Sequence, residues 1–169
     1  SQWILPGPLG AHNWMSMSYN PDTGLVYIPA QESPLVFDLD HDFKANGKFK
    51  YVEGGWNTGL EFGRYLEIAG EHPTAPLPRG YLTAFDPLTG KTHWIREHGS
   101  HWNGGTLSTA AGLVFQGNSD GFLVAYDATT GDELWKVNTY TSIIAPPITF
   151  MVDGEQYVSI QVGSGGAAI

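Results

Sequence analysis

The sequence predicts an all-β fold, a partial β-propeller of about two and a half four-stranded antiparallel blades. Three observations lead to this prediction. The 169-residue chain contains 22 glycines and 11 prolines, a composition that suits short strands joined by tight turns. The stretch 80–94 recurs at 121–135, and further strand pairs flank both copies. Four strands in roughly 40 residues, repeated, are typical of propeller blades.

The repeat aligns GYLTAFDPLTGKTHW (80–94) with GFLVAYDATTGDELW (121–135) at an offset of 41 residues. Each copy predicts a strand, a D-x-x-T-G turn and a second strand that reaches a tryptophan. The aspartate accepts hydrogen bonds from turn amides, and the glycine takes the positive φ that closes the hairpin. We expect Trp94 and Trp135 to be docking residues that wedge between neighbouring blades, because a large flat side chain covers much apolar area there.

The other strand pairs complete the blades in chain order. WMSMSYNPDTGLVYIPA (14–30) predicts a pair around a turn at 22–24, and with the hairpin at 80–96 it forms the first blade. GTLSTAAGLVFQG (105–117) and the hairpin at 121–135 form the second blade. PPITFMVDGEQYVSIQVG (146–163) supplies half of a third, turning at 153–154. Propellers close with about four to eight blades, so we expect the remainder of a longer propeller chain, or self-association, to complete the ring.

The first blade is interrupted by an inserted loop at about 31–79 that shows neither helical nor strand periodicity. A loop of this length within a compact domain is usually functional or forms part of a partner surface. Within it, Asp38, Asp40 and Asp42 follow the spacing of an EF-hand loop. The sixth position is Phe43 and the twelfth is Phe49, so the turn glycine and the bidentate glutamate are missing. We therefore expect a solvated acidic loop.

Charge and composition exclude several classes of function. The formal net charge is -9, which repels a phosphate backbone and disfavours nucleic acid and anionic membranes as partners. No apolar run reaches the roughly 18 residues that a membrane span needs. The chain has no cysteine, which excludes disulfides, zinc–thiolate sites and covalent haem attachment within these residues. His93, Glu97, His98 and His101 match no zinc spacing, and we expect them to be surface residues.

Several blocks of the sequence resemble a known family. They are GAHNWMSMSYNPDTGLVYIPAQE, GGWNTG, WNGGTLSTAAGLVFQGNSDG, AYDATTGDELW, IAPPITFMVDGEQYV and GSGG, in that order. Together they resemble the C-terminal part of the quinoprotein alcohol dehydrogenases that use pyrroloquinoline quinone (PQQ). The resemblance implies that residues 1–169 are a C-terminal fragment of an eight-bladed propeller domain whose blades are locked by tryptophan docking motifs.

The resemblance also implies an activity. In this family PQQ and a calcium ion lie in the central funnel, and a catalytic aspartate takes the alcohol proton while hydride passes to the quinone. A cytochrome or ubiquinone then accepts the electrons, and the enzymes are periplasmic. The chain is thus expected to be the C-terminal portion of a PQQ-dependent alcohol dehydrogenase that oxidises primary alcohols. As an isolated fragment it is expected to be inactive.

The family blocks suggest cofactor-binding residues in this chain. The HNW block places Asn13 and Trp14 beside the quinone, and an amide can bind an anionic cofactor without adding charge. The WNGG block indicates that Asn103 or Trp102 lines the same funnel, and VGSGG points to Gly163 with Ser164. The competing interpretation makes Asn13 a strand cap and Trp14 a core aromatic residue. The family's catalytic aspartate and calcium ligands have no counterpart here, because Asp86 and Asp127 occupy turns, so we predict neither a catalytic nor a metal-binding residue.

A function of another class stays open. The same tryptophan-docked repeats build non-catalytic propeller scaffolds for protein assembly. Such a scaffold keeps the D-x-x-T-G rhythm but has no reason to carry HNW and WNGG together, which favours the enzyme. Exposed strand edges and inter-blade faces are also templates for pairing between copies, so we expect the fragment by itself to self-associate.

Overall fold

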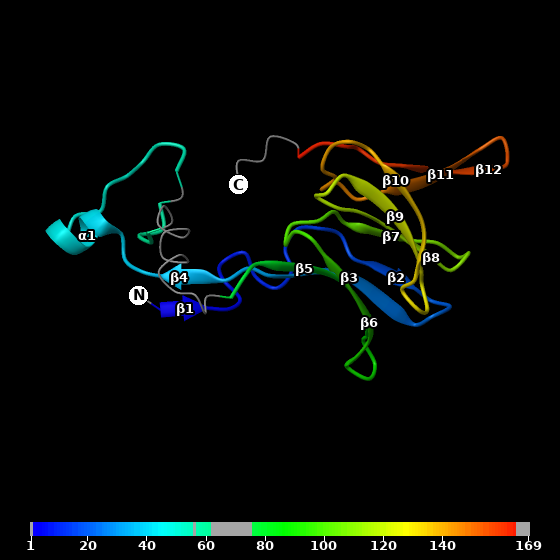
Figure 1. Ribbon diagram of the computed structural model, residues 1–169, viewed down its shortest axis with the longest axis horizontal. Helices are drawn as coiled ribbons and strands as arrows, with labels where there is room; N and C mark the ends of the chain where they lie inside the picture. Colours follow the sequence, from blue (N-terminus) through cyan, green and yellow to red (C-terminus); the bar gives the residue numbers. More distant parts are fainter. Residues whose placement is uncertain (1, 56, 62–75, 165–169) are drawn as a thin grey trace.

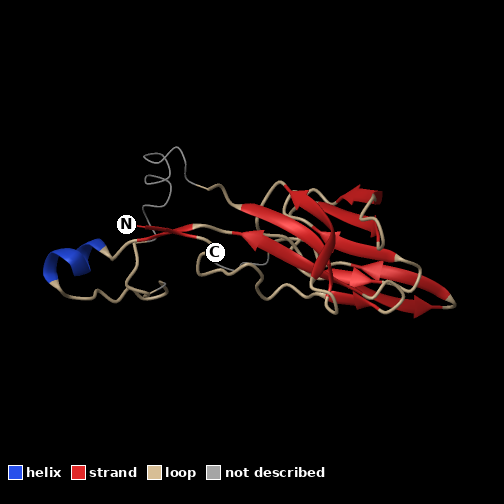
Figure 2. Cartoon of the chain, turned by 90° about the horizontal axis from the view of Figure 1, so that it is seen from below, coloured by secondary structure: helices blue, strands red, loops and turns tan. Residues whose placement is uncertain are grey.

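The computed structural model describes residues 2–55, 57–61 and 76–164, and the predicted all-β blade architecture is confirmed (Figures 1 and 2). The strands are β1 (Gln2–Ile4), β2 (Ser18–Asn20), β3 (Leu25–Glu32), β4 (Leu35–Phe37), β5 (Arg79–Asp86), β6 (Lys91–His98), β7 (Thr106–Ser108), β8 (Leu113–Gly117), β9 (Phe122–Asp127), β10 (Glu133–Asn138), β11 (Ile148–Val152) and β12 (Glu155–Ser159). One short helix, α1 (His41–Asn46), lies between β4 and β5.

Two antiparallel sheets of four strands form the blades. The first has the strand order β2-β3-β5-β6 and the second β7-β8-β9-β10. β3 pairs with β5 over seven residues, from Val26 opposite Phe85 to Glu32 opposite Arg79, although the insertion separates the two strands in the sequence. β11 and β12 form a separate hairpin, which is the expected half of a third blade.

The turns obtain their shape from the predicted chemistry. In the β5–β6 turn the Asp86 carboxylate accepts the Leu88 amide at 2.8 Å and the Thr89 hydroxyl at 2.6 Å, bonds that lower the Asp86 pKa. In the β9–β10 turn Asp127 Oδ1 accepts the amides of Thr129 and Thr130, both at 2.8 Å. These bonds likewise lower the Asp127 pKa, that of Thr130 most. Hydrogen bonds within the turn therefore fix the conformation of each hairpin.

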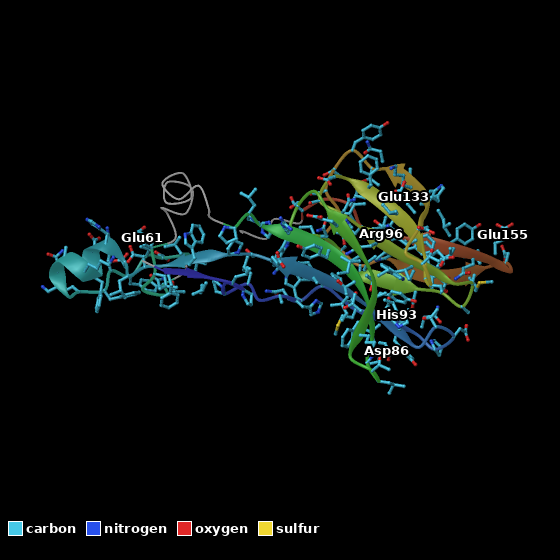
Figure 3. All side chains as sticks on the ribbon, turned by 60° about the horizontal axis from the view of Figure 1, so that its bottom comes forward. Glu61, Asp86, His93, Arg96, Glu133 and Glu155 are labelled. Carbon is cyan, nitrogen blue, oxygen red and sulfur yellow. The ribbon has the colours of Figure 1, made fainter. Side chains whose placement is uncertain are left out.

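The insertion between β3 and β5 contains regular structure that its sequence did not indicate. β4 turns back to pair with β1, which forms a two-stranded ribbon that leads away from the blades. Helix α1 follows, with the Asp40 carboxylate accepting the Phe43 amide at 2.9 Å as its N-cap and Gly47 as its left-handed C-cap. Glu61 lies on this arm, at the opposite end of the molecule from Glu155 in the β11–β12 hairpin (Figure 3). Trp56 of the GGWNTG block and residues 62–75 lie outside the described residues.

The apolar core lies between the two complete blades. It comprises Leu25, Tyr27, Leu82, Ala84, Trp94, Val114, Val124, Tyr126 and Ala128. Burial raises the pKa of Tyr126 to about 12. Inward and outward residues alternate along the strands. In β3, for example, the buried residues are Leu25, Tyr27, Pro29 and Gln31. Each blade therefore presents one largely apolar face to the other. Because both blades contribute side chains, neither blade buries its core without the other.

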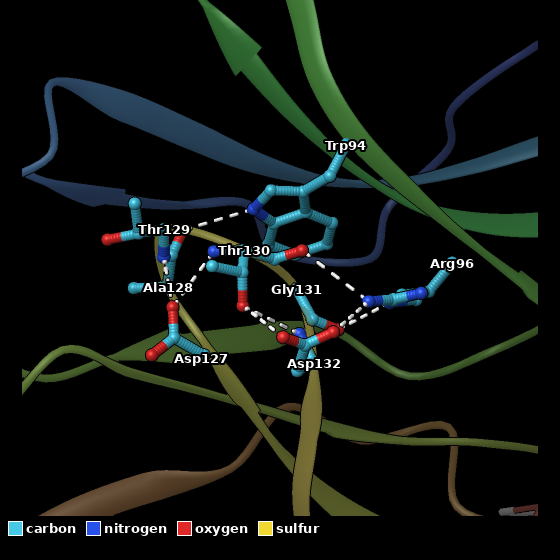
Figure 4. A network of polar contacts seen from close by, with 8 residues as sticks. All are labelled: Trp94, Arg96, Asp127, Ala128, Thr129, Thr130, Gly131 and Asp132. Atoms are coloured by element: carbon cyan, nitrogen blue, oxygen red, sulfur yellow. Dashed lines mark hydrogen bonds and ion pairs between the residues drawn. The ribbon is translucent and has the colours of Figure 1, made fainter.

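The Trp94 indole joins the blades by docking on the turn of the second blade (Figure 4). Its Nε1 donates to the Ala128 carbonyl at 3.1 Å, and the same carbonyl accepts the Tyr27 hydroxyl at 2.9 Å. Two residues beyond Trp94 on β6, the Arg96 guanidinium donates to the Gly131 carbonyl and to Asp132 Oδ1. The expected docking role of Trp94 is thus confirmed.

Trp135, the matching residue of the second blade, has a different environment. It lies on β10 and is 50% exposed, whereas Trp94 is 9% exposed. Docking requires a D-x-x-T-G turn on the following blade, and residues 132–169 contain none. Trp135 therefore has no such turn to dock on within this chain, and its docking between blades stays a prediction for the complete ring.

Replacement of Gly131 by alanine tests the docking geometry, with Gly90→Ala as the matched control. Both glycines have a φ of +73° at the same turn position, so both substitutions incur the left-handed strain of about 1–2 kcal/mol. A Cβ on Gly131 meets Trp94 Cδ2 at 2.6 Å, whereas a Cβ on Gly90 meets nothing within 4 Å. We expect Gly131→Ala to lower the free energy of unfolding, measured by urea denaturation, by about 1–3 kcal/mol more than Gly90→Ala. Equal losses would contradict the docking interpretation.

Candidate functional site

The segments that lead into three inner strands converge at one end of the blades. The Thr106 amide donates to the Ser16 carbonyl at 2.9 Å, joining the start of β7 to the residues before β2. A Cβ on Gly105 would meet Ser16 Oγ at 2.5 Å and Pro146 Cβ at 2.8 Å. Gly105 therefore has one neighbouring blade on each side. The glycines of the WNGG block thus permit a close approach of three chain segments, and this convergence forms the candidate site.

The loop that carries Asn13 and Trp14 rests on the end of β3. Buried Gln31 donates through Nε2 to the Leu9 carbonyl at 3.0 Å, and the Gln31 amide donates to the Ala11 carbonyl at 2.8 Å. The Asn13 side chain donates to the Leu9 carbonyl at 3.0 Å and accepts the Trp14 amide at 2.8 Å. An amide group has further hydrogen-bonding capacity beyond these two bonds, so Asn13 can still bind a ligand group.

Trp14 and Trp102 meet at this site. Their ring centroids are 6.2 Å apart in an edge-to-face arrangement, although 88 residues separate them in the sequence. Trp14 is 55% exposed and therefore offers ring surface, which is not what a core aromatic residue would do. The Trp102 Nε1 is buried and has no hydrogen-bond partner among the described residues. Buried N–H groups are rarely left unpaired. We call the pair of Trp14 and Trp102 the aromatic corner, and a ligand bound there could accept a hydrogen bond from the Trp102 Nε1.

Asn103 is 2% exposed, and its side chain is bonded within the protein. Its Nδ2 donates to the Ser100 carbonyl at 2.7 Å, and its Oδ1 accepts the Ser119 amide at 3.3 Å. In this arrangement the amide group holds the 99–105 loop, which carries Trp102. The structure therefore gives Asn103 a positioning role, and direct contact with a cofactor stays a prediction from the sequence.

Gly163 lies beside the segment that enters the third half-blade. It forms an isolated parallel bridge with Ile143, and its amide donates to the Ser142 carbonyl at 2.7 Å. Its φ is +110°, and a Cβ there would meet no atom of the described residues within 4 Å. The backbone at Gly163 is thus open to an approaching group. The rest of the GSGG block, residues 165 and 166, lies outside the described residues.

The expectation of a surface histidine group is correct for His93 but wrong for His98. His93 is exposed and lies with Asp86 toward the turn end of the β5–β6 hairpin (Figure 3). His98, at the other end of β6, is partly buried and contacts the Gln116 Oε1 at 2.9 Å. Gln116 in turn donates to the Gly104 carbonyl at 2.9 Å. Because the Gln116 Oε1 only accepts, the His98 Nε2 carries the proton. No sequence motif predicted this pair. Through Gln116 it is hydrogen-bonded to the WNGG segment and helps to hold that segment in place.

Burial lowers the pKa of His98 below its usual 6.5, against opposing effects of the Gln116 hydrogen bond and the Asp120 charge. Burial also lowers the pKa of His101, whose ring contacts Trp102 edge to face at 6.3 Å between centroids.

Over residues 2–55, 57–61 and 76–164, no group of three or more histidine, aspartate or glutamate side chains could hold a metal ion. In the EF-hand-like stretch Asp40 caps α1, and Asp38 pairs with Lys44. Nor does any helix in the described part of the chain have the length and apolar character needed to cross a membrane.

Comparisons with known proteins connect this geometry to a family. Residues 1–158 match the family described as PQQ: glucose/ethanol/alcohol dehydrogenase, β-propeller domain. The quinohemoprotein alcohol dehydrogenase of Comamonas testosteroni is 51% identical over 168 residues, which cover 98% of this chain and 23% of that protein. The 1-butanol dehydrogenase (cytochrome c) of Thauera butanivorans is 47% identical over 164 residues, covering 95% of this chain and 23% of that protein.

The solved structures give the same result. The crystal structure of quinohemoprotein alcohol dehydrogenase from Comamonas testosteroni matches with a TM-score of 0.79 and 48% sequence identity. The match covers 96% of this chain and 24% of that one. The chain therefore spans about a quarter of the length of the relatives that it matches.

The lowered histidine pKa values predict acid sensitivity. Well above pH 6.5 the His98 ring is neutral in both the folded and the unfolded chain, so its protonation has no effect on stability there. As the pH falls below 6.5, the unfolded chain binds the proton first, because the folded pKa is lower, and the free energy of unfolding decreases. We expect urea denaturation at pH 5 and pH 7.5 to show a smaller difference for His98→Gln than for the unmodified chain. The exposed-site control His93→Gln should keep the original difference, and an unchanged difference in His98→Gln would disprove the assignment.

Proposed function

The chain belongs to the β-propeller domain family of glucose, ethanol and alcohol dehydrogenases, and we propose that it supplies part of the PQQ-binding funnel of an alcohol dehydrogenase. In the complete protein this funnel would be used to oxidise primary alcohols. The chain corresponds to about a quarter of each relative's length. We therefore assign the activity to the complete protein and not to this chain alone. The two complete blades and the half-blade would form a sector of the ring.

The observation that carries the proposal is the aromatic corner of Trp14 and Trp102. Three features of the described residues fit a flat, polar, anionic cofactor: the exposed face of Trp14, the buried and unpaired Trp102 Nε1, and the remaining hydrogen-bonding capacity of Asn13. Aromatic faces suit a planar ring system, and neutral N–H donors suit carboxylate and carbonyl oxygens. Gly163 would allow close approach of the backbone, and Asn103 would hold the loop of Trp102.

The chemistry is divided between this sector and the rest of the enzyme. When bound, PQQ would supply the hydride-accepting group for alcohol oxidation. The residues of this chain would orient the cofactor and exclude water from one side, since Asn13, Trp14 and Trp102 contain no carboxylate that could act as a base near neutral pH. A catalytic aspartate and a calcium ion, as the resemblance implies, would have to be held by other parts of the protein.

The electron acceptor and the location are proposed on the same grounds. One relative is named 1-butanol dehydrogenase (cytochrome c), and others are named alcohol dehydrogenase (quinone). These names support a cytochrome or ubiquinone as the acceptor. The resemblance to the quinoprotein family supports a periplasmic location. A non-catalytic scaffold is the weaker alternative, because the matches to alcohol dehydrogenases, at 51% and 47% identity, cover 98% and 95% of this chain.

Variants at the aromatic corner test the proposed binding role in the complete enzyme. We expect Trp102→Ala and Asn13→Ala each to raise the dissociation constant for PQQ, measured by equilibrium titration, by about three- to tenfold, since a hydrogen bond or aromatic contact contributes roughly 0.5–1.5 kcal/mol. The control is Leu88→Ala, which alters a 94% exposed residue in the β5–β6 turn. It should leave the constant unchanged. Unchanged affinity in both corner variants would refute the role of this corner.

The isolated chain tests the division of labour. With added PQQ and calcium, we expect the 169-residue chain to show no turnover of ethanol with an artificial electron acceptor, because the described residues provide neither a candidate base at the corner nor a metal site. The complete enzyme, assayed alongside, is the positive control. Robust turnover by the chain alone would show that the catalytic groups lie within it.

A further inference from the structure

The chain contains the dipeptide Asn-Gly twice, in opposite environments. Asn46-Gly47 ends helix α1 on the arm, and Asn103-Gly104 lies in the candidate site. Asn-Gly is the dipeptide in which asparagine loses its amide group most readily, because glycine has no side chain to hinder attack by its own backbone nitrogen. We propose that Asn46 is a site of spontaneous deamidation and that the fold protects Asn103. This inference does not depend on the proposed function.

The reaction needs only water as a co-reactant. The Gly47 backbone nitrogen, after losing its proton to solvent, attacks Cγ of Asn46. A C–N bond forms and closes a five-membered succinimide, while the Cγ–Nδ2 bond breaks and Nδ2 leaves as ammonia. Water then opens the ring at either carbonyl, which gives aspartate or isoaspartate at position 46. Net, water is consumed and ammonia is released, and no atom is oxidised or reduced.

The environment of Asn46 permits this chemistry. Asn46 is exposed, and a Cβ on Gly47 would meet no atom of the described residues within 4 Å. The Gly47 amide donates to the Phe43 carbonyl at 2.8 Å, so the last turn of α1 must open before the nitrogen can attack. That opening is easy, because α1 has six residues and none of them is buried. Short helices without tertiary packing fray readily.

The environment of Asn103 opposes each step. The residue is 2% exposed, and both atoms of its amide group are hydrogen-bonded, to Ser100 and Ser119. The Gly104 amide, which would have to attack, donates to the Gly117 carbonyl at 2.9 Å. A Cβ on Gly104 would meet the Ala145 carbonyl oxygen at 2.9 Å, so the backbone there has no space to rotate. Reaction at Asn103 therefore requires the 99–105 loop to detach from β8 and from the residues that follow it.

Deamidation at position 46 changes the charge of the arm. A carboxylate would replace the amide in the last turn of α1, where the helix dipole disfavours negative charge. Asp42 lies four residues earlier on the same helix, and like charges at this spacing destabilise a helix. The formal net charge of the chain, -9, would become more negative by one. The insertion would thus acquire a time-dependent change in charge and in helix stability.

The test follows both asparagines in the same sample. The purified chain is incubated in mildly alkaline buffer, and aspartate and isoaspartate at both positions are quantified by peptide mass spectrometry. We expect conversion at Asn46 to be more than about tenfold faster than at Asn103, because the two sites differ in opening free energy. In denaturant, the two rates should become similar. Asn46→Gln, whose longer side chain cannot form the five-membered ring, should abolish modification at position 46 and leave Asn103 unchanged.

Two outcomes would overturn the proposal. Equal rates at the two positions in native buffer would show that the fold does not discriminate between them. An unmodified Asn46, after a time in which Asn103 reacts in denaturant, would show that the end of α1 is protected instead of open.

Discussion

The packing of the Trp94 indole on the 127–131 turn is the contact on which the rest of the structure depends. The Ala128 carbonyl receives hydrogen bonds from Trp94 and from Tyr27, both on the first blade. Gly131 leaves room for the ring, and its φ of +73° closes the hairpin at the same time. One residue thus satisfies a local and a tertiary requirement, which explains why turn and tryptophan recur together at the same spacing.

The position of the candidate site follows from the docking of Trp94 on the 127–131 turn. Docking near the outer strands sets the distance between the blades, and the inner strands must then fit within the remaining space. Gly104, Gly105 and Gly117 fill it, since a Cβ on any of them would lie 2.9 Å or less from an atom of a neighbouring segment. Trp14 and Trp102 belong to different blades and meet only because the blades are held in this way. The site is therefore a product of blade packing, and its precision depends on that packing.

The parts of the fold that were predictable from the sequence are those encoded locally. Turn residues and strand alternation identified both blades, because the D-x-x-T-G hydrogen bonds form within five residues. The β1–β4 ribbon and α1 were not predicted, since three-residue strands and a six-residue helix are too short to show a period. The link from His98 through Gln116 to Gly104 joins residues of three segments. No spacing in the sequence reveals such a link. The family blocks found Asn13 and Trp14, but only the structure shows that the Asn103 amide is bonded within the protein.

Two contacts of the kind made by Trp94 are incomplete in the described part of the chain. Gly90 has the turn geometry of Gly131 but no ring packed on it, and Trp135 has the strand position of Trp94 but no turn beneath it. Each is one half of the contact that Trp94 and Gly131 complete. A blade added at either side would bury the exposed half, and a cofactor on the axis would then contact residues from several blades. The Trp102 Nε1 is a further incomplete contact, because it is buried and has no hydrogen-bond partner among the described residues. In the proposed ring, the cofactor would supply that partner.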